Sequence, residues 1–294
     1  MGARVLATKV FNMSSNNPLA DRFIFDDPKY LKLAEENAER YQNGDPFPSI
    51  YFDNFLPLDV AEAVWQEFPK PDQADWNDLR RPDETKMLCA DEREFGPVTR
   101  QLMYQFNSNG FLAFLEKLTG IKNLIPDPSM SGGGLHQTLP GGLLKLHADF
   151  NLHNELKLDR RVNILIYMNK DWQDEWGGHL ELWDKDCKRM GNKIAPLFNR
   201  LGMFSTTSES FHGHPDPLTC PPGNSRKSIA LYYYTNGRQK TSEADAHTTI
   251  FRARPGEQLS GLQLHKIQDW VPPVIWRGIR DWRAKAQFKG QAKR

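Results

Sequence analysis

The feature that most limits how this chain can fold is the pattern of its second half. From about residue 131 onward, apolar runs are only four to seven residues long, and Gly, Pro, Asn or Asp separates each run from the next. These runs, rich in β-branched and aromatic residues, are residues 143–146, 162–168, 179–183, 201–205, 229–234 and 248–253. Short strands separated by turn residues are typical of a β-barrel or a double-sheet roll. We therefore expect the second half to be all-β.

The first half has a helical periodicity instead. Apolar side chains recur at helical spacing in residues 29–42, about 57–68 and 97–119, and a short extended segment lies at residues 49–52. We therefore expect a mainly β protein with a helical N-terminal layer (α+β), combined in one integrated domain. Its parts are a helical region over residues 1–125, a β core over residues 126–256, and a basic tail over residues 257–294. A solvated helix is the preferred interpretation of the tail, with contact to a membrane surface or RNA as the alternative.

Composition and charge exclude several classes of protein. Lys and Arg total 38 against 37 Asp and Glu, a net charge of +1, which argues against a dedicated nucleic-acid binder. No apolar run approaches the roughly 20 residues that span a bilayer, and the N-terminus lacks the apolar segment of a signal peptide. Three widely spaced cysteines indicate reduced thiols. We expect a cytoplasmic globular protein without membrane or nucleic-acid partners.

Two residues carry the first indication of chemistry. His147 and Asp149 are two apart on an expected strand, so both side chains lie on the same face. An imidazole and a carboxylate that converge in this way supply two of the three ligands of the facial triad in non-haem Fe(II) oxygenases. Such a pair alone is common. Its weight comes from the motifs that follow it in order: Tyr167-Met168-Asn169, Gly177-Gly178 before a strand, His212-Gly213, and Arg226-Lys227-Ser228 before a strand.

With this ordered set, residues of about 130–240 resemble the 2-oxoglutarate and Fe(II)-dependent oxygenases, in their prolyl-hydroxylase-like branch. The resemblance implies a double-stranded β-helix, also called a jelly roll or cupin-like core, which agrees with the strand pattern above. It also implies hydroxylation of an unactivated C–H bond, with 2-oxoglutarate and O2 converted to succinate and CO2. The residues it assigns to Fe(II) are His147, Asp149 and His212, and those it assigns to 2-oxoglutarate are Arg226, Ser228, Tyr167 and Asn163.

Two of these assignments have competitors. His214 could replace His212 as the distal ligand, but the family ligand usually precedes a small residue, which favours His212. Lys227 could replace Arg226 as the cation, but strand alternation puts Lys227 on the face opposite Ser228. An expected insertion at residues 216–223 makes the interval between the distal histidine and the arginine longer than the family pattern.

The substrate is defined less sharply. The glycine-rich residues 132–142 are expected to form a flexible rim over the site, and the two tryptophans at 172 and 176 are expected to serve packing. Candidate substrate-facing groups are His136, Gln137, Asn151, His153 and His214.

The balanced charge and the lack of a separate peptide-binding or nucleic-acid domain favour a small-molecule substrate, such as an amino acid or a biosynthetic intermediate. The first alternative is a protein prolyl or other residue hydroxylase. The second is a non-enzymatic jelly-roll module with a structural zinc, against which the Arg226–Ser228 pair argues. The sequence does not define the oligomeric state.

Overall fold

The computed structural model describes residues 17–237 and 246–257 of the chain. The described residues up to Gly256 belong to one compact unit. The tail expected to form a basic helix lies outside the described residues from residue 258 onward. Among the described residues, no helix has both the length and the apolar character needed to cross a membrane.

Four α-helices form in the N-terminal half, in agreement with the predicted ranges: α1 (Pro28–Gln42), α2 (Leu58–Glu67), α3 (Pro97–Phe106) and α4 (Asn109–Thr119). Their ends follow from local chemistry. The side chain of Asp27 accepts a hydrogen bond from the backbone N–H of Lys29 and caps α1. Ser108 caps α4 in the same way, and Gly120 ends that helix in the left-handed conformation with φ +74°.

Helix α2 departs from the expected pattern in its exposed side chains. Two of the apolar side chains in the predicted range, Leu58 and Trp65, are 63% and 37% exposed, whereas Val60 is buried. The buried side chains Val60, Ala61 and Val64 lie at helical spacing and form the face that packs into the core. The carboxylate of Glu67 at the end of α2 accepts hydrogen bonds from the first backbone N–H groups of α3 and so joins the two helices.

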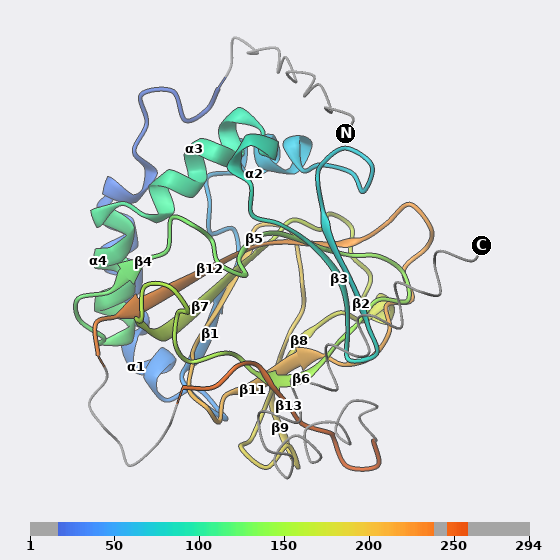
Figure 1. Ribbon diagram of the computed structural model, residues 1–294. Coiled ribbons are helices and arrows are strands. Elements are labelled where there is room, and N and C mark those ends of the chain that lie inside the picture. The colour runs from blue at the N-terminus through green and yellow to red at the C-terminus, as the bar shows by residue number, and fades with distance from the viewer. Residues whose placement is uncertain (1–16, 238–245, 258–294) are drawn as a thin grey trace. The chain divides into compact units, whose positions relative to one another are not determined.

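Thirteen antiparallel strands of the described residues form one sheet that nearly closes into a barrel (Figure 1). Their order is β1-β10-β7-β12-β5-β3-β6-β11-β8-β9, with β2 paired to β3, β4 to β12 and β13 to β6. The strands are β1 (Ser49–Phe52), β2 (Asn77–Arg81), β3 (Glu84–Cys89), β4 (Ile125–Pro126), β5 (Gly134–Thr138), β6 (Leu144–Ala148), β7 (Asp159–Tyr167), β8 (Leu180–Trp183), β9 (Met190–Ile194), β10 (Arg200–Ser205), β11 (Phe211–His214), β12 (Arg226–Thr235) and β13 (Ile250–Phe251). This is the architecture expected of a double-stranded β-helix, and each of the six predicted strand segments is present.

One expectation about the glycine-rich segment is wrong. Residues 134–138 are not a flexible rim but the buried strand β5, which pairs with β12 on one side and β3 on the other. The hairpin β2–β3 was also not anticipated, and it places β3 next to both β5 and β6. A segment from the N-terminal half thus completes the wall of the barrel.

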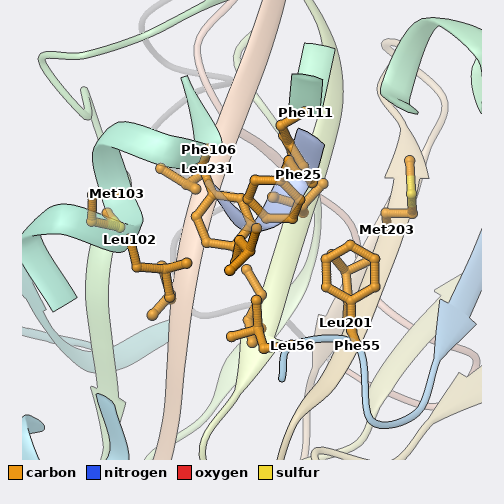
Figure 2. Packing of buried hydrophobic residues seen from close by; sticks show 14 of the residues in the cluster. Phe25, Phe55, Leu56, Leu102, Met103, Phe106, Phe111, Leu201, Met203 and Leu231 are labelled. Atoms are coloured by element: carbon orange, nitrogen blue, oxygen red, sulfur yellow. The ribbon is translucent and has the colours of Figure 1, made fainter. Parts of the chain in front are cut away.

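The largest core lies between the helices and the outer face of the sheet. Strand β7 directs Val162, Ile164 and Ile166 into this core, while the alternate residues of the same strand face the barrel interior. Figure 2 shows part of the cluster, where aromatic side chains from the helical layer meet aliphatic and methionine side chains of β10 and β12. Burial of each phenylalanine contributes ~1.5–3 kcal/mol, so the helical layer holds the outer face of the strands that form the site.

Candidate active site

Three potential metal ligands converge at one end of the barrel. His147 lies on β6, directly opposite His212 on β11, and Asp149 follows the end of β6. Nε2 of His147 is 3.5 Å from Oδ1 of Asp149, and Nε2 of His212 is 3.3 Å from Oδ2 of the same carboxylate. The three ligand atoms lie within 4.8 Å of one another. The pairing of β6 with β11 therefore produces the two-histidine, one-carboxylate arrangement that could hold a metal ion.

A backbone carbonyl group fixes the ring orientation of each of the two histidines. Nδ1 of His147 donates to the carbonyl oxygen of Lys145 at 2.9 Å, and Nδ1 of His212 donates to that of Ser210 at 2.9 Å. These hydrogen bonds place the proton on Nδ1 and leave the lone pair of each Nε2 directed toward Asp149, as in metal-bound histidines. Burial, and then the neighbouring His147, lower the pKa of His212. The neutral form that a metal requires is thus favoured.

The carboxylate of Asp149 has two buried polar neighbours. The amide nitrogen of Asn163 donates to its Oδ2 at 2.6 Å, and Nη2 of Arg160 lies 3.1 Å from the same oxygen. Burial would raise the pKa of Asp149, but Arg160 and the two histidines lower it well below its usual value. The group is therefore ionised, as a metal ligand must be. Asn163, predicted to contact 2-oxoglutarate, has its amide engaged with this carboxylate.

A buried cation lies across the pocket from the triad. Arg226 at the start of β12 is 6% exposed, and its Nε donates to the carbonyl oxygen of Gly178 at 2.6 Å. Its Nη2 donates to the hydroxyl of Tyr167 at 3.3 Å, and burial lowers the pKa of the guanidinium. No carboxylate of residues 17–237 or 246–257 forms an ion pair with it. An enclosed guanidinium of this kind fits an anionic ligand, because burial of an unpaired charge is costly.

The backbone next to Arg226 requires glycine. Gly178 has φ +72°, and a Cβ there would lie 2.7 Å from Leu218 and 3.0 Å from the Cδ of Arg226. The predicted Gly-Gly motif thus permits the close approach of the arginine to the segment that leads into β8.

Two further polar groups in the pocket have no partner among the described residues. They are the hydroxyl of Ser228, two residues after Arg226 on β12, and Nδ1 of His214 on β11. Burial, and then Arg226, hold the pKa of His214 well below its usual value. Buried groups of this kind are normally hydrogen-bonded. Their position around Arg226 fits the polar ends of a bound oxo acid.

The pocket has a cavity volume of about 60 Å³, and its lining includes residues that the sequence did not indicate. Lys86 reaches it from β3 and pairs with Glu84 at 3.1 Å. Lys86 also lines a neighbouring cavity of about 350 Å³ between the β2–β3 hairpin and the turn at residues 139–142. The hairpin therefore contributes a cation to the mouth of the site.

The remaining candidate residues fall into two groups. His136 lines the pocket from β5, and its Nε2 is 3.1 Å from the carbonyl oxygen of Gly132. Gln137 points the other way and donates to Ser225 at 2.7 Å. Asn151 and His153 do not line the pocket; the first pairs with the backbone of His247, and the second accepts hydrogen bonds from the loop that follows it.

Residues outside the pocket agree with two further predictions. Trp172 and Trp176 pack edge to face at 5.2 Å, as expected for a packing role. Leu218 and Cys220, from the segment predicted as an insertion, complete this small apolar cluster. Lys227 lies on the face opposite Arg226, with its Nζ near the carbonyl oxygen of Ser225.

Comparisons with known proteins agree with this geometry. Residues 133–234 match the family model of the 2OG-Fe(II) oxygenase superfamily. The chain is 29% identical over 196 residues to Prolyl 3-hydroxylase OGFOD1 of Mus musculus. The aligned region covers 65% of this chain and 33% of that relative, so the chain spans about one third of the relative's length.

Solved structures show the same fold. A prolyl hydroxylase from Trichoplax adhaerens, in complex with a hypoxia inducible factor oxygen degradation domain peptide, superimposes with a TM-score of 0.53 at 18% identity. That match covers 72% of this chain and 93% of the other. A structure of prolyl 4-hydroxylases from Phytophthora capsici gives a TM-score of 0.52 at 16% identity, covering 78% and 69% of the two chains. The likeness identifies the barrel as a double-stranded β-helix.

Proposed function

We propose that this chain is a 2OG-Fe(II) oxygenase and that it hydroxylates a residue of a protein substrate. The observation that carries the oxygenase activity is the buried Arg226, which has no acidic partner among the described residues and faces the His147, Asp149 and His212 triad across one pocket. A metal next to an enclosed cation suits a co-substrate that chelates through one end and carries a carboxylate at the other.

The roles that we assign follow from the contacts. Fe(II) would be held by Nε2 of His147, Nε2 of His212 and the carboxylate of Asp149. Arg226 would bind the distal carboxylate of 2-oxoglutarate, with Ser228 and His214 as further hydrogen-bonding groups and Tyr167 orienting the guanidinium. The bound iron supplies the chemistry that couples O2 and 2-oxoglutarate to oxidation of a C–H bond, with succinate and CO2 as co-products. The protein's own contribution is to orient these groups and to keep them from water.

The space around the site and the names of the relatives support a protein substrate as the alternative to the small molecule that the sequence favoured. The cavity at the triad is about 60 Å³, whereas pockets that enclose a drug-sized ligand measure roughly 300–1,000 Å³. With 2-oxoglutarate bound, only the reacting group of a substrate would reach the metal, and the rest of the substrate would lie outside this cavity. The neighbouring cavity of about 350 Å³, which shares Lys86, could hold the residues flanking the oxidised one. The relatives with prolyl hydroxylase names point in the same direction.

A structural zinc in a non-enzymatic module does not account for the buried Arg226 beside the three ligands. Four ligands normally close a structural zinc site, and three converge here among the residues that the structure describes. Such a site also has no use for a buried guanidinium beside it.

The proposal is tested by succinate formation from 2-oxoglutarate with Fe(II) and O2. The protein is supplied in parallel with a library of peptides that carry a central proline and with free L-proline and other free amino acids. Stimulation of succinate formation by peptides, together with a mass gain of one oxygen atom on the peptide, supports a protein substrate. Stimulation by free amino acids alone would return the assignment to a small molecule.

The oxygenase assignment itself has a separate control. His147→Ala should abolish succinate formation under all conditions, including slow turnover without substrate. If wild type and His147→Ala form succinate at the same rate, the site does not perform this reaction.

A further inference from the structure

The carboxylate of Asp149 belongs to a closed ring of three side chains. Nε of Arg160 donates to Oδ1 of Asn163 at 2.9 Å, and Nδ2 of Asn163 donates to Oδ2 of Asp149 at 2.6 Å. Nη2 of Arg160 completes the ring, 3.1 Å from the same Oδ2. Arg160 and Asn163 are three residues apart near the start of β7, and both are buried. The side-chain oxygen of Asn163 thus accepts a hydrogen bond from Arg160, while its side-chain nitrogen donates one to Asp149.

The guanidinium of Arg160 also contacts two aromatic rings. Its Cζ lies 3.5 Å from the ring centroid of Tyr232 on β12 and 4.5 Å from that of Phe150, which follows Asp149. The side chain is 1% exposed. A planar cation stacked on two aromatic rings has little rotational freedom, so its direction toward Asp149 is set by packing.

This arrangement treats the two oxygens of Asp149 differently. Oδ2 accepts from Asn163, lies 3.1 Å from Arg160 and is also 3.3 Å from Nε2 of His212, whereas Oδ1 lies 3.5 Å from Nε2 of His147 and has neither Asn163 nor Arg160 on it. We infer that Arg160 and Asn163 are positioning residues that hold Asp149 as a one-oxygen metal ligand, with Oδ1 directed at the ion. Asn163 therefore serves the metal and not 2-oxoglutarate. This inference rests on the proposed function, because it takes Asp149 to be a metal ligand.

The test measures Co(II) binding to the apoprotein without oxygen, by competition with a coloured chelator. We expect Arg160→Gln and Asn163→Leu each to weaken Co(II) binding by roughly 10- to 100-fold, the usual effect of removing groups that orient metal ligands. The visible d–d absorption of bound Co(II) should change in shape, because a freed carboxylate can bind through both oxygens. Arg160→Lys should not restore the wild-type spectrum, since an ammonium lacks the planar fork.

The matched control is Arg161→Gln. Arg161 is the next residue on β7, donates to the hydroxyl of Thr235 and does not line the pocket of the triad. Its replacement should leave Co(II) affinity and the spectrum unchanged. The Asn163→Leu variant keeps the test informative if Arg160→Gln fails to fold.

A double-mutant cycle separates positioning from a general structural role. In an Asp149→Gly background, Asn163→Leu should have no further effect on Co(II) affinity, because the residue acts through the carboxylate. An equal loss in both backgrounds, or wild-type affinity in the single variants, would overturn the inference while leaving the proposed function intact. If wild type binds no stoichiometric Co(II), or Asp149→Gly binds it equally well, the proposed metal site itself is wrong.

Discussion

Replacing Arg226 by methionine should weaken 2-oxoglutarate binding without a comparable loss of stability. The guanidinium is buried and has no carboxylate partner among the described residues, so the apoprotein bears the cost of its desolvation. Methionine has a similar length and no charge. Its introduction relieves that cost, several kcal/mol for a buried ion, and leaves the carbonyl of Gly178 without its donor, a loss of about 1–3 kcal/mol. The apoprotein should therefore be as stable as wild type or more stable.

The affinity for 2-oxoglutarate, in contrast, should fall. Truncation of one partner of a buried, hydrogen-bonded charge pair costs about 2–5 kcal/mol, which corresponds to a roughly 30- to 4,000-fold increase in Kd. The Kd is measured anaerobically with Fe(II) from the visible charge-transfer band as 2-oxoglutarate is added, and stability is measured by urea denaturation of the apoprotein. Lys227→Met is the matched control, since this neighbour lies on the opposite face of β12. Wild-type Kd for Arg226→Met, or an equal increase for Lys227→Met, would refute the reasoning.

Three further outcomes follow from the site. Burial, and then Lys86, hold the pKa of His136 well below its usual value, so this ring stays neutral in the folded state while the unfolded chain binds a proton below about pH 6.5. The free energy of unfolding should therefore fall as pH drops below that value, and His136→Gln should reduce the slope by up to about 1.4 kcal/mol per pH unit, measured by urea denaturation across this range. A Cβ on Gly213 would lie 2.6 Å from the carbonyl oxygen of Leu144, so Gly213→Ala should push β11 from β6, cost about 1–3 kcal/mol and weaken Co(II) binding; thermal melts and metal titration check both. Lys86→Met should raise KM for a peptide substrate while leaving KM for 2-oxoglutarate within about threefold in steady-state assays, and the reverse result would remove Lys86 from the substrate side.

The parts of the fold that the sequence predicts are those where one face of an element is apolar. Strand β7 alternates between the helix-side core and the barrel interior, and its neighbour β12 does the same, so period-two patterning placed Arg226 and Ser228 inside the barrel. The order of the motifs along the chain then led to His147, Asp149 and His212, which the structure brings together.

The missed elements lack that signal. Strand β2 is largely exposed along its length, so it carries no apolar alternation. All five residues of β5 are buried, which also removes the alternation, and its glycine neighbours resemble a loop. The contribution of Arg160 depends on a carboxylate on another strand segment and on two aromatic rings, so only three-dimensional packing reveals it. The strand β7 begins with three charged residues, Asp159, Arg160 and Arg161, and nothing in the sequence distinguishes Arg160 from its two neighbours.

The insertion of β3 into the barrel wall has a consequence for how the chain acquires its structure during synthesis. Strand β3 leaves the ribosome well before its partners β5 and β6. Strand β1, residues 49–52, cannot pair until residues 201–204 of β10 have been made. Pairings between such distant segments form slowly, because the loop between them must close first. The helices can form early from local contacts, whereas the ring of strands cannot close before residue 235 has been made. Nascent chains thus expose unpaired strand edges for most of translation, and their yield should depend on the rate of elongation and on chaperones that cover β3.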